Sequence, residues 1–589
     1  MTAPGAQQPL YLDTGGGTFG LLHPAAGGER AAVLVVPPFG WDDVASYRPR
    51  RDWAQALARA GHPALRIDLP ATGDSAGAPD DPQLVERWIG AIADAASWLR
   101  ATTGRDRMAV IALGLGGLLS LAAIDRGAPV DDLVLWGAPA RGRTAVRELR
   151  AFARLGQGGA VPTAPELGVV VNGHALRPQT LEALGALDAS GLRLPPELRV
   201  LVLDRDGIAP DAKLVAALEA AGAAVATAPG AGWGAMLVAP HDAVPPVATF
   251  ARVGAWLADG AAVGARRRWN AEPVAVGDRL DLAGGVTERP FELRTAAGAT
   301  FGILTESARP AAGRPLVVLL NAGAIRRVGP NRMYVEAARR WAAAGIASLR
   351  LDLAGIGDAD GDGTRFADVA AFHRPELLEQ VRAVLEDLAG RDPAAAPATL
   401  IGLCSGAHWA FQTALTSPEI ERIVLLNPRA LFWEDDLGAA RDLRHYLSRA
   451  RDPQTWRRAL RGELSLTYLR RNAPAMLRRA VRAPVRMAAR RRARRTGRVA
   501  GPGPGDRVDR ALRRITGHGT EVLMLFTAEE PLHDEFERDG RLARLTPGRG
   551  VEIRRIGGDL AAHTLQPAPL QADVHRLLDA ELGLGSAAP

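Results

Sequence analysis

Short runs of apolar residues alternate along the chain with longer segments in which apolar residues recur every three or four positions. In the second half, the continuous apolar runs span four to seven residues, which is typical of strands buried on both faces of a mostly parallel sheet. The amphipathic segments between them predict covering helices. We predict strands at 316–321, 347–353, 398–403, 422–427 and 521–527, and helices at 333–345, 374–390 and 570–582.

The pattern of the second half also occurs in the first half. Self-similarity of this kind indicates two copies of one fold. Three pairs of segments match at offsets of 282 to 284 residues: 17-GTFGLLHP-24 with 299-ATFGILTE-306, 34-LVVPPFG-40 with 318-VLLNAGA-324, and 66-RIDLPATGDSAG-77 with 350-RLDLAGIGDADG-361. The sequence therefore predicts an α/β protein with two similar domains in tandem.

The only cysteine, Cys404, lies in 401-IGLCSGA-407, directly after a predicted strand and before a helical run. Taken alone, such a cysteine is most often a buried, unreactive side chain. A nucleophile between small residues at a sharp strand-to-helix turn is, however, the nucleophile elbow of hydrolases. On this motif, its place in the strand order and a histidine near the C-terminus, the chain resembles the α/β-hydrolase superfamily over nearly all of both halves.

The resemblance implies two tandem α/β-hydrolase domains, each a mostly parallel sheet with helices on both faces and a helical lid. We place the first domain at 8–262, a linker at 263–290 and the second domain at 291–585. The segments 321-NAGAIRRVGPNRMYVEAARRW-341 and 350-RLDLAGIGD-358 are also similar to hydrolases associated with exopolysaccharide or secondary-metabolite clusters.

An insertion marks the expected lid of the second domain. The offset between the copies grows from 290 residues at the elbow to 327 near the C-terminus, so the second copy has 37 extra residues, expected within about 430–518. Net charge is +7, yet 441–516 alone carries 23 Arg against five Asp or Glu, which leaves the remainder of the chain at −11. An amphipathic basic lid would suit acidic substrates, carrier-protein surfaces, phosphates or a membrane face, or be a solvated helical face.

The family order of nucleophile, acid and histidine implies a catalytic set. Cys404 would attack as a thiolate, with its pKa lowered by a helix N-terminus and an imidazole. His563, in 556-IGGDLAAHTLQP-567, would accept and return the proton, and a carboxylate would orient its ring. Glu530 fits the position of the acid, with Asp534 as the alternative.

Negative charge on a tetrahedral intermediate requires backbone donors close to the nucleophile. In the family these are the N–H after the nucleophile and one from the loop after an early strand. The resemblance assigns them to Ser405 and to the 321-NAG-323 turn, where Ala322 or Gly323 is the expected donor.

The first copy lacks the nucleophile and the base. Gly114 occupies the place of Cys404, and Met236 occupies the place of His563. Asp204 or Asp206 could still mimic the acid. We therefore predict a degenerate hydrolase, a pseudoenzyme domain retained for packing, for gating the second site or for binding a ligand.

The leading hypothesis is hydrolysis of a small-molecule ester or thioester through an acyl-cysteine, with acidic and carrier-bound substrates among the candidates. An acyltransferase using the same site and a non-catalytic binding protein are the alternatives. No metal, cofactor or nucleic acid is expected, because no metal site, P-loop, dinucleotide fingerprint or nucleic-acid module occurs. No apolar run reaches about 18 residues, and a lone cysteine requires no oxidising compartment, so a cytoplasmic protein is expected. Pairing of the two halves would replace a homodimer contact.

Overall fold

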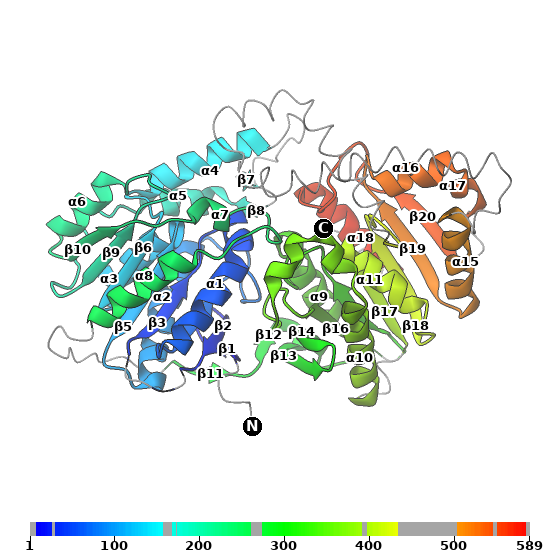
Figure 1. Ribbon diagram of the computed structural model, residues 1–589, viewed down its shortest axis with the longest axis horizontal. Helices are drawn as coiled ribbons and strands as arrows, with labels where there is room; N and C mark the ends of the chain where they lie inside the picture. The colour runs from blue at the N-terminus through cyan, green and yellow to red at the C-terminus, as the bar shows by residue number, and fades with distance from the viewer. Residues whose placement is uncertain are drawn as a thin grey trace.

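The computed structural model describes residues 7–25, 27, 30–156, 168–171, 174–260, 274–311, 313–391, 397–433, 504–545 and 550–584. These residues form two nine-stranded sheets that lie side by side, each with helices packed against both faces (Figure 1). The β7–β8 hairpin (Val169–Val171 and His174–Leu176) lies apart from both sheets.

The first sheet has the strand order β10-β9-β6-β5-β3-β4-β2-β1-β11. Its strands are β1 (Gln8–Leu12), β2 (Thr18–His23), β3 (Ala32–Val36), β4 (Ala64–Ile67), β5 (Met108–Leu113), β6 (Asp132–Trp136), β9 (Arg199–Leu203), β10 (Ala224–Ala228) and β11 (Val276–Gly277). Side chains of α1 (Trp41–Arg59) and α8 (Val247–Gly260) pack on one face, and those of α2 (Leu84–Thr103) and α3 (Leu115–Asp125) on the other. The remaining helices are α4 (Gly142–Gly156), α5 (Pro178–Ala186), α6 (Ala212–Ala220) and α7 (Trp233–Met236).

The second sheet has the order β12-β13-β14-β16-β15-β17-β18-β19-β20. Its strands are β12 (Leu280–Leu282), β13 (Val286–Thr295), β14 (Gly298–Ser307), β15 (Leu316–Leu320), β16 (Ser348–Asp352), β17 (Ala398–Leu403), β18 (Ile420–Leu426), β19 (Glu521–Phe526) and β20 (Val551–Arg555). Helices α9 (Met333–Ala343) and α18 (Ala568–Glu581) cover one face, and α10 (Pro375–Arg391), α11 (Ser405–Ala414) and α15 (Pro504–Gly517) cover the other. Two short helices, α16 (Pro531–Arg538) and α17 (Arg541–Arg544), follow β19.

The two sheets have the same sequence of pairings. In each, the strands from the middle to one edge are parallel, and the pairings at the opposite edge are antiparallel. The predicted α/β class with two mostly parallel sheets is confirmed, and the predicted strands and helices of the second half occur within two residues of their expected ends. Most of the expected lid, 434–503, lies outside the described residues.

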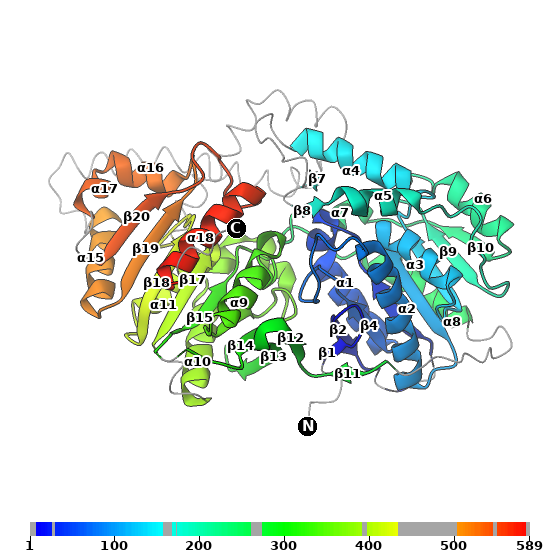
Figure 2. The ribbon, with the colours of Figure 1, turned by 180° about the vertical axis from the view of Figure 1, so that it is seen from behind.

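The segment between the halves takes part in both sheets. β11 pairs with β1 at the edge of the first sheet, and β12 pairs with β13 at the edge of the second. Both short strands fall within the segment expected to be a linker, 263–290, of which 263–273 lies outside the described residues. The two antiparallel edges are therefore close to each other, as the view from behind also shows (Figure 2).

Buried ion pairs join the halves in a reciprocal pattern. Arg66 donates to Asp358 at 2.8 Å, and Arg350 donates to Asp74 at 3.1 Å. The four residues occupy equivalent places in the repeated segments, so each half supplies an arginine to the other half's aspartate. Arg327, fully buried, bridges both aspartates, with Asp74 at 2.6 Å and Asp358 at 2.7 Å. Buried charges require such partners, because a charge left alone in the interior is costly.

An apolar cluster lies beside these ion pairs. Phe19 and Leu21 of β2 pack with Phe301 and Ile303 of β14, and all four are at most 1% exposed. Burying a large apolar side chain stabilises by roughly 1.5–3 kcal/mol. Apolar contact and charge pairing therefore act at the same surface between the halves.

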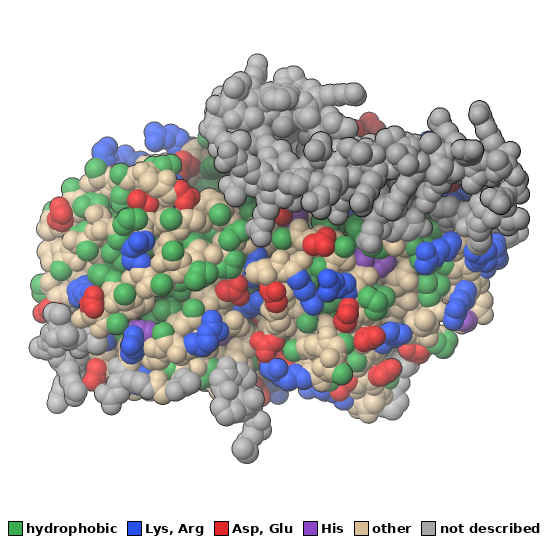
Figure 3. All heavy atoms as spheres, in the orientation of Figure 1, with side chains coloured by type: hydrophobic (Ala, Val, Ile, Leu, Met, Phe, Trp, Pro, Cys, Tyr) green, Lys and Arg blue, Asp and Glu red, His purple; other side chains and the backbone are tan. Residues whose placement is uncertain are grey.

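Positively and negatively charged side chains are interspersed over the described surface of both halves on the face shown in Figure 3. The Arg-rich sequence responsible for the positive net charge lies mainly outside the described residues. Among the described helices, none is both long enough and apolar enough to cross a membrane.

Candidate active site

Cys404 lies at the turn between β17 and α11, where the backbone is strained. Its φ of 56° and ψ of −108° are unusual for a residue with a side chain. The equivalent Gly114 of the first half adopts nearly the same conformation, with φ 53° and ψ −126°. A conformation that glycine adopts without cost is therefore kept in the second half for a cysteine.

The glycines around Cys404 are required by close packing. A Cβ atom at Gly402 would lie 2.1 Å from the carbonyl oxygen of Gly406, and one at Gly406 would lie 2.2 Å from that of Leu320. Both distances are far below van der Waals contact. The sequence Gly-Leu-Cys-Ser-Gly thus allows α11 to start directly against β15 and β17, with the cysteine at the tip of the turn.

His563 and Glu530 come together at the carboxyl ends of the strands. Glu530 caps the start of α16 after β19, and His563 lies in the loop between β20 and α18. The Nδ1 atom of His563 is 2.9 Å from Oε1 and 3.0 Å from Oε2 of Glu530. Glu530 is 3% exposed, and its Oε1 also accepts a hydrogen bond from the Thr527 hydroxyl at 3.3 Å. The carboxylate is therefore fixed, and it orients the imidazole.

The other ring nitrogen of His563 is available for chemistry. Its Nε2 atom is buried and has no hydrogen-bond partner among the described atoms. Burial lowers the pKa of His563, but the Cys404 thiolate and the Glu530 carboxylate more than offset this and raise it to about 9. Burial likewise raises the pKa of the Cys404 thiol, but His563, the Arg429 cation and the N–H of Ser405 lower it below its ordinary value. Both pKa shifts act in the direction of a thiolate beside an imidazolium.

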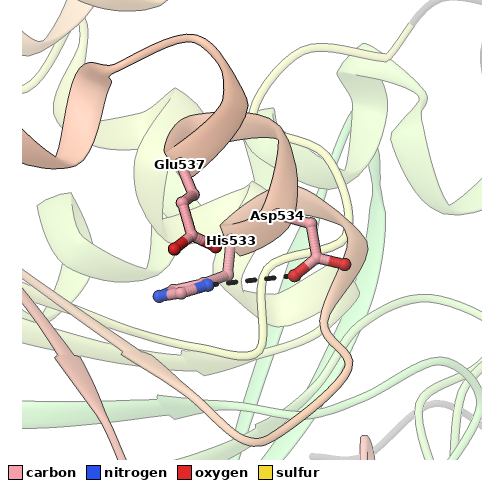
Figure 4. A group of neighbouring side chains, drawn as sticks. All are labelled: His533, Asp534 and Glu537. Carbon is pink, nitrogen blue, oxygen red and sulfur yellow. Dashed lines mark ion pairs between the residues drawn. The ribbon is translucent and has the colours of Figure 1, made fainter.

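Asp534, the alternative acid, lies on α16 away from this contact. Its carboxylate is next to another histidine, with Oδ1 4.0 Å from Nδ1 of His533 (Figure 4). His533, Asp534 and Glu537 together bring three potential metal-ligand atoms within 4.8 Å of one another. Both carboxylates are solvent-exposed, and we assign no metal to this group.

Two of the backbone N–H groups that were expected to stabilise the oxyanion donate hydrogen bonds within the protein. The N–H of Gly323 donates to the Ser405 hydroxyl at 2.7 Å, and the N–H of Ala322 donates to the side chain of Asn321 at 2.9 Å. The N–H of Ser405 helps to lower the pKa of the Cys404 thiol. The N–H of Gly323 becomes available to another acceptor only when the Ser405 hydroxyl releases it.

Asn427, at the end of β18, is a positioning residue that the sequence did not reveal. It has a positive φ of 43°, and its side chain accepts from the Thr527 N–H at 2.8 Å and donates to the carbonyl of His563 at 2.9 Å. It therefore connects the loop of the candidate acid to the loop of the histidine. In the sequence, the end of the apolar strand at 427-NPRA-430 was the available signal that Asn427 has a role in the site. It did not specify the hydrogen-bond partners of Asn427.

Aromatic side chains gather one turn beyond the cysteine. His408 of α11 contacts His373 edge to face with ring centroids 4.6 Å apart, and His373 stacks on Trp433 at 3.8 Å. Burial lowers the pKa of His408 to about 4 and that of His373 to about 3. Both rings are therefore neutral at pH 7, and they form an uncharged aromatic cluster on the second half.

The first half uses its corresponding carboxylates to hold a loop. Asp206 accepts hydrogen bonds from the N–H groups of Gly232 and Gly234, and Asp204 accepts one from Gly230 at 2.9 Å. Met236, at the place of the histidine, is fully buried. No thiol or imidazole stands at the equivalent positions, in agreement with the sequence.

Parts of the chain are similar to a known family and to several solved structures. Residues 317–494 match the Hydrolase_4 family model, described as serine aminopeptidase, S33. The dienelactone hydrolase from Anabaena variabilis is 13% identical, with 50% of this chain and 96% of that chain covered and a TM-score of 0.30. The esterase Pf2001 from Pyrococcus furiosus is 15% identical, covering 50% and 92%, with a TM-score of 0.32. Est1E from Butyrivibrio proteoclasticus is also 15% identical, covering 43% and 99%, with a TM-score of 0.32. A search of curated proteins gives no match.

The second half matches a family of α/β hydrolases over residues 317–494, and the fold of both halves is α/β. The elbow after β17 carries Cys404, whereas the description of the matched family refers to a serine enzyme.

Proposed function

We propose that the second half is a cysteine-dependent hydrolase that cleaves an ester or thioester through an acyl-cysteine intermediate. One observation carries the proposal: the only cysteine of the chain occupies the strained elbow, beside a histidine whose Nδ1 is held by a buried carboxylate and whose Nε2 is unpartnered. Nucleophile, base and orienting acid in this mutual arrangement are what acyl transfer requires.

The reaction follows from the protonation states of the pair. The Cys404 thiolate attacks the carbonyl carbon, and the electron pair moves to the carbonyl oxygen. When the intermediate collapses, the proton on Nε2 of His563 passes to the departing alkoxide or thiolate. His563, now neutral, takes a proton from water as the hydroxide attacks the acyl-cysteine. Collapse releases a carboxylic acid and restores the thiolate and the imidazolium.

The oxyanion is stabilised by the N–H groups at the elbow and the early turn. Ser405 N–H already lies beside the sulfur. The second donor is the N–H of Gly323, which the Ser405 hydroxyl must first release by rotating about its χ1 angle. Removing a single donor of this kind typically costs 10²–10³ in kcat, about 2.7–4 kcal/mol. The substrate carbonyl oxygen therefore competes with the Ser405 hydroxyl for the N–H of Gly323.

We further propose that pairing of the halves supports this turn. The side chain of Asn321 donates to the carbonyl of Ile325 at 2.8 Å, and the next residue, Arg326, donates to Asp68 of the first half at 2.9 and 3.0 Å. Arg327 follows and binds Asp74 of the first half. The degenerate half would thus hold the donor turn of the active half in place.

The first half also contacts the second next to the aromatic cluster of His373, His408 and Trp433. The ring of His241 lies edge to face against Phe372, with centroids 6.4 Å apart. A Cβ atom at Gly323 would in turn be only 3.9 Å from Phe372. We propose that the loop containing His241 bounds the substrate site from the side of the degenerate half.

Turnover of p-nitrophenyl esters and acyl thioesters by the wild type and three variants tests the proposal. We expect Cys404→Ala to lose at least about a thousandfold in kcat/KM, because no other thiol can replace the nucleophile. Cys404→Ser should retain a fraction, and His518→Ala, which removes an exposed histidine, should match the wild type. Full activity in Cys404→Ala would exclude the proposal. Analysis of the products separates release of the acid from transfer to an added alcohol or amine.

A further inference from the structure

A cavity of about 300 Å³ lies between the two halves and does not include Cys404. From the first half it is lined by the start of α1, the loop after β4, α2 and the β8 strand. From the second half it is lined by 324–332, by the start of α9 and by α18. Its volume is at the lower end of the range for small-molecule sites, and such sites often form between domains.

One side of the cavity is apolar. Phe39, which occupies the place of Gly323 in the first half, lies 5.7 Å from Trp88 between ring centroids. Leu69, Leu84 and Leu176 complete this side. The position equivalent to the oxyanion turn thus carries an aromatic ring, which can pack against an apolar body.

The other side carries two arginines at equivalent places of the repeat, Arg48 and Arg332. Each is 8% exposed. Arg332 donates to the carbonyls of Gly73 at 2.9 Å and Ser75 at 2.6 Å, and no carboxylate of the described residues lies within ion-pair distance of it. Burial, with the nearby Arg339 cation, lowers the pKa of Arg332 to about 9.

Arg48 is also incompletely satisfied. It donates to the carbonyl of Ala243, but its Nε and Nη1 atoms are buried without a hydrogen bond, and its nearest carboxylate, Asp52, is 3.9 Å away. By contrast, the arginines of the ion-pair network between the halves are bonded to aspartates at 2.6–3.1 Å. Polar groups that are buried without partners are rare in native proteins and indicate a missing ligand or water.

Two more groups define the charge and polarity that a ligand would meet. Glu336 lines the cavity and makes no ion pair within the described part of the chain. Nε2 of His174 is buried without a hydrogen bond, and burial lowers the pKa of this histidine to about 4. Two incompletely paired arginines beside a neutral imidazole favour an anionic group on the ligand.

We propose that this cavity binds a small organic carboxylate, whose apolar body packs against Phe39 and Trp88 and whose carboxylate is bound by Arg48 and Arg332. A ligand held by both arginines contacts both halves, and its binding free energy adds to the stability of their pairing. The site does not depend on the reaction at Cys404. It gives the degenerate half a binding role at the place where it has lost the chemistry.

Isothermal titration calorimetry of the full chain tests the proposal. Cys404 is first alkylated with iodoacetamide, which blocks the candidate active site. The probes are 3-phenylpropanoate, octanoate and indole-3-acetate, with 3-phenylpropan-1-ol as the neutral counterpart. We expect at least one carboxylate to bind, and 3-phenylpropanoate to bind at least tenfold more tightly than the alcohol. Binding should also raise the temperature of unfolding.

Variants locate the binding. Arg48→Gln and Arg332→Gln should each weaken it at least tenfold, whereas Arg576→Gln, which removes an exposed arginine from α18, should leave it unchanged. Ala572→Trp fills the cavity from an exposed position of the same helix and should also abolish binding without affecting folding. The proposal is overturned if no carboxylate binds, if the alcohol binds equally well, or if Ala572→Trp binds like the wild type.

Discussion

Replacing Glu530 with Gln removes the charge that orients His563 and keeps the shape of the side chain. In the wild-type protein both carboxylate oxygens lie 2.9–3.0 Å from Nδ1 of His563, and Glu530 is 3% exposed. A hydrogen bond to a charged group contributes about 1.5–3 kcal/mol. If that contribution is present when the imidazolium forms, Glu530→Gln lowers kcat/KM by roughly 10- to 150-fold.

The same substitution lowers the pKa of His563, because Glu530 is one of the groups that raise it to about 9. The fall of activity at alkaline pH should therefore begin at a lower pH in Glu530→Gln than in the wild type. Initial rates on a p-nitrophenyl ester across pH 5–10 measure both effects. Asp534→Asn is the matched control, since it removes a carboxylate from the same helix that does not contact His563, and it should change kcat/KM less than twofold. A larger loss in Asp534→Asn than in Glu530→Gln would refute the assignment of the acid.

Three further outcomes are expected. Asp358→Asn leaves two buried arginines underpaired between the halves, so it should lower the free energy of unfolding by about 3–5 kcal/mol in denaturant titrations. The control Asp360→Asn, on the surface, should lower it by less than about 0.5 kcal/mol. Equal effects of the two substitutions would contradict a stabilising network of ion pairs. Ser405→Ala frees the N–H of Gly323, so kcat/KM should be at least as high as in the wild type, and a tenfold loss would instead make the hydroxyl part of the oxyanion site. The wild-type profile of kcat/KM should fall above pH 9, as His563 loses the proton that the leaving group needs, and a profile still rising at pH 10 would contradict the raised pKa.

The sequence predicted the fold well because its signals are local. Short apolar runs such as 398–403, alternating with amphipathic segments, indicated buried strands, and close packing of Gly402 and Gly406 explains the Gly-Leu-Cys-Ser-Gly turn. The resemblance to the α/β-hydrolase family then indicated which loops carry the acid and the histidine. That is why His563 and Glu530, 33 residues apart, could be proposed as partners from the sequence.

Features that depend on distant parts of the chain were not predictable in the same way. Arg66 and Asp358 are 292 residues apart, and nothing in the repeated segments showed that each copy would bind the other instead of itself. The hydrogen bond from Gly323 N–H to the Ser405 hydroxyl depends on a rotamer, which a sequence pattern does not contain. Nothing in the sequence distinguished Arg48 and Arg332, which are only 8% exposed in the folded chain.

The contacts between the two halves are reciprocal. The reciprocal ion pairs and the cluster of β2 and β14 occupy equivalent surfaces of the two halves, as in a symmetric dimer. Joining the copies lets the two sites change independently. In the first half Phe39 stands at the place of Gly323, and Gly114 and Met236 stand at the places of Cys404 and His563.

The central claim is that Cys404 forms the acyl bond and that His563 makes it reactive. Intact-protein mass spectrometry after a brief reaction with an acyl p-nitrophenyl ester, followed by peptide mapping, measures this directly. The account predicts one acyl group per chain, located on the peptide of Cys404 and reduced at least tenfold in His563→Ala at the same reaction time. An unmodified Cys404, or an adduct that forms equally fast in His563→Ala, would contradict it.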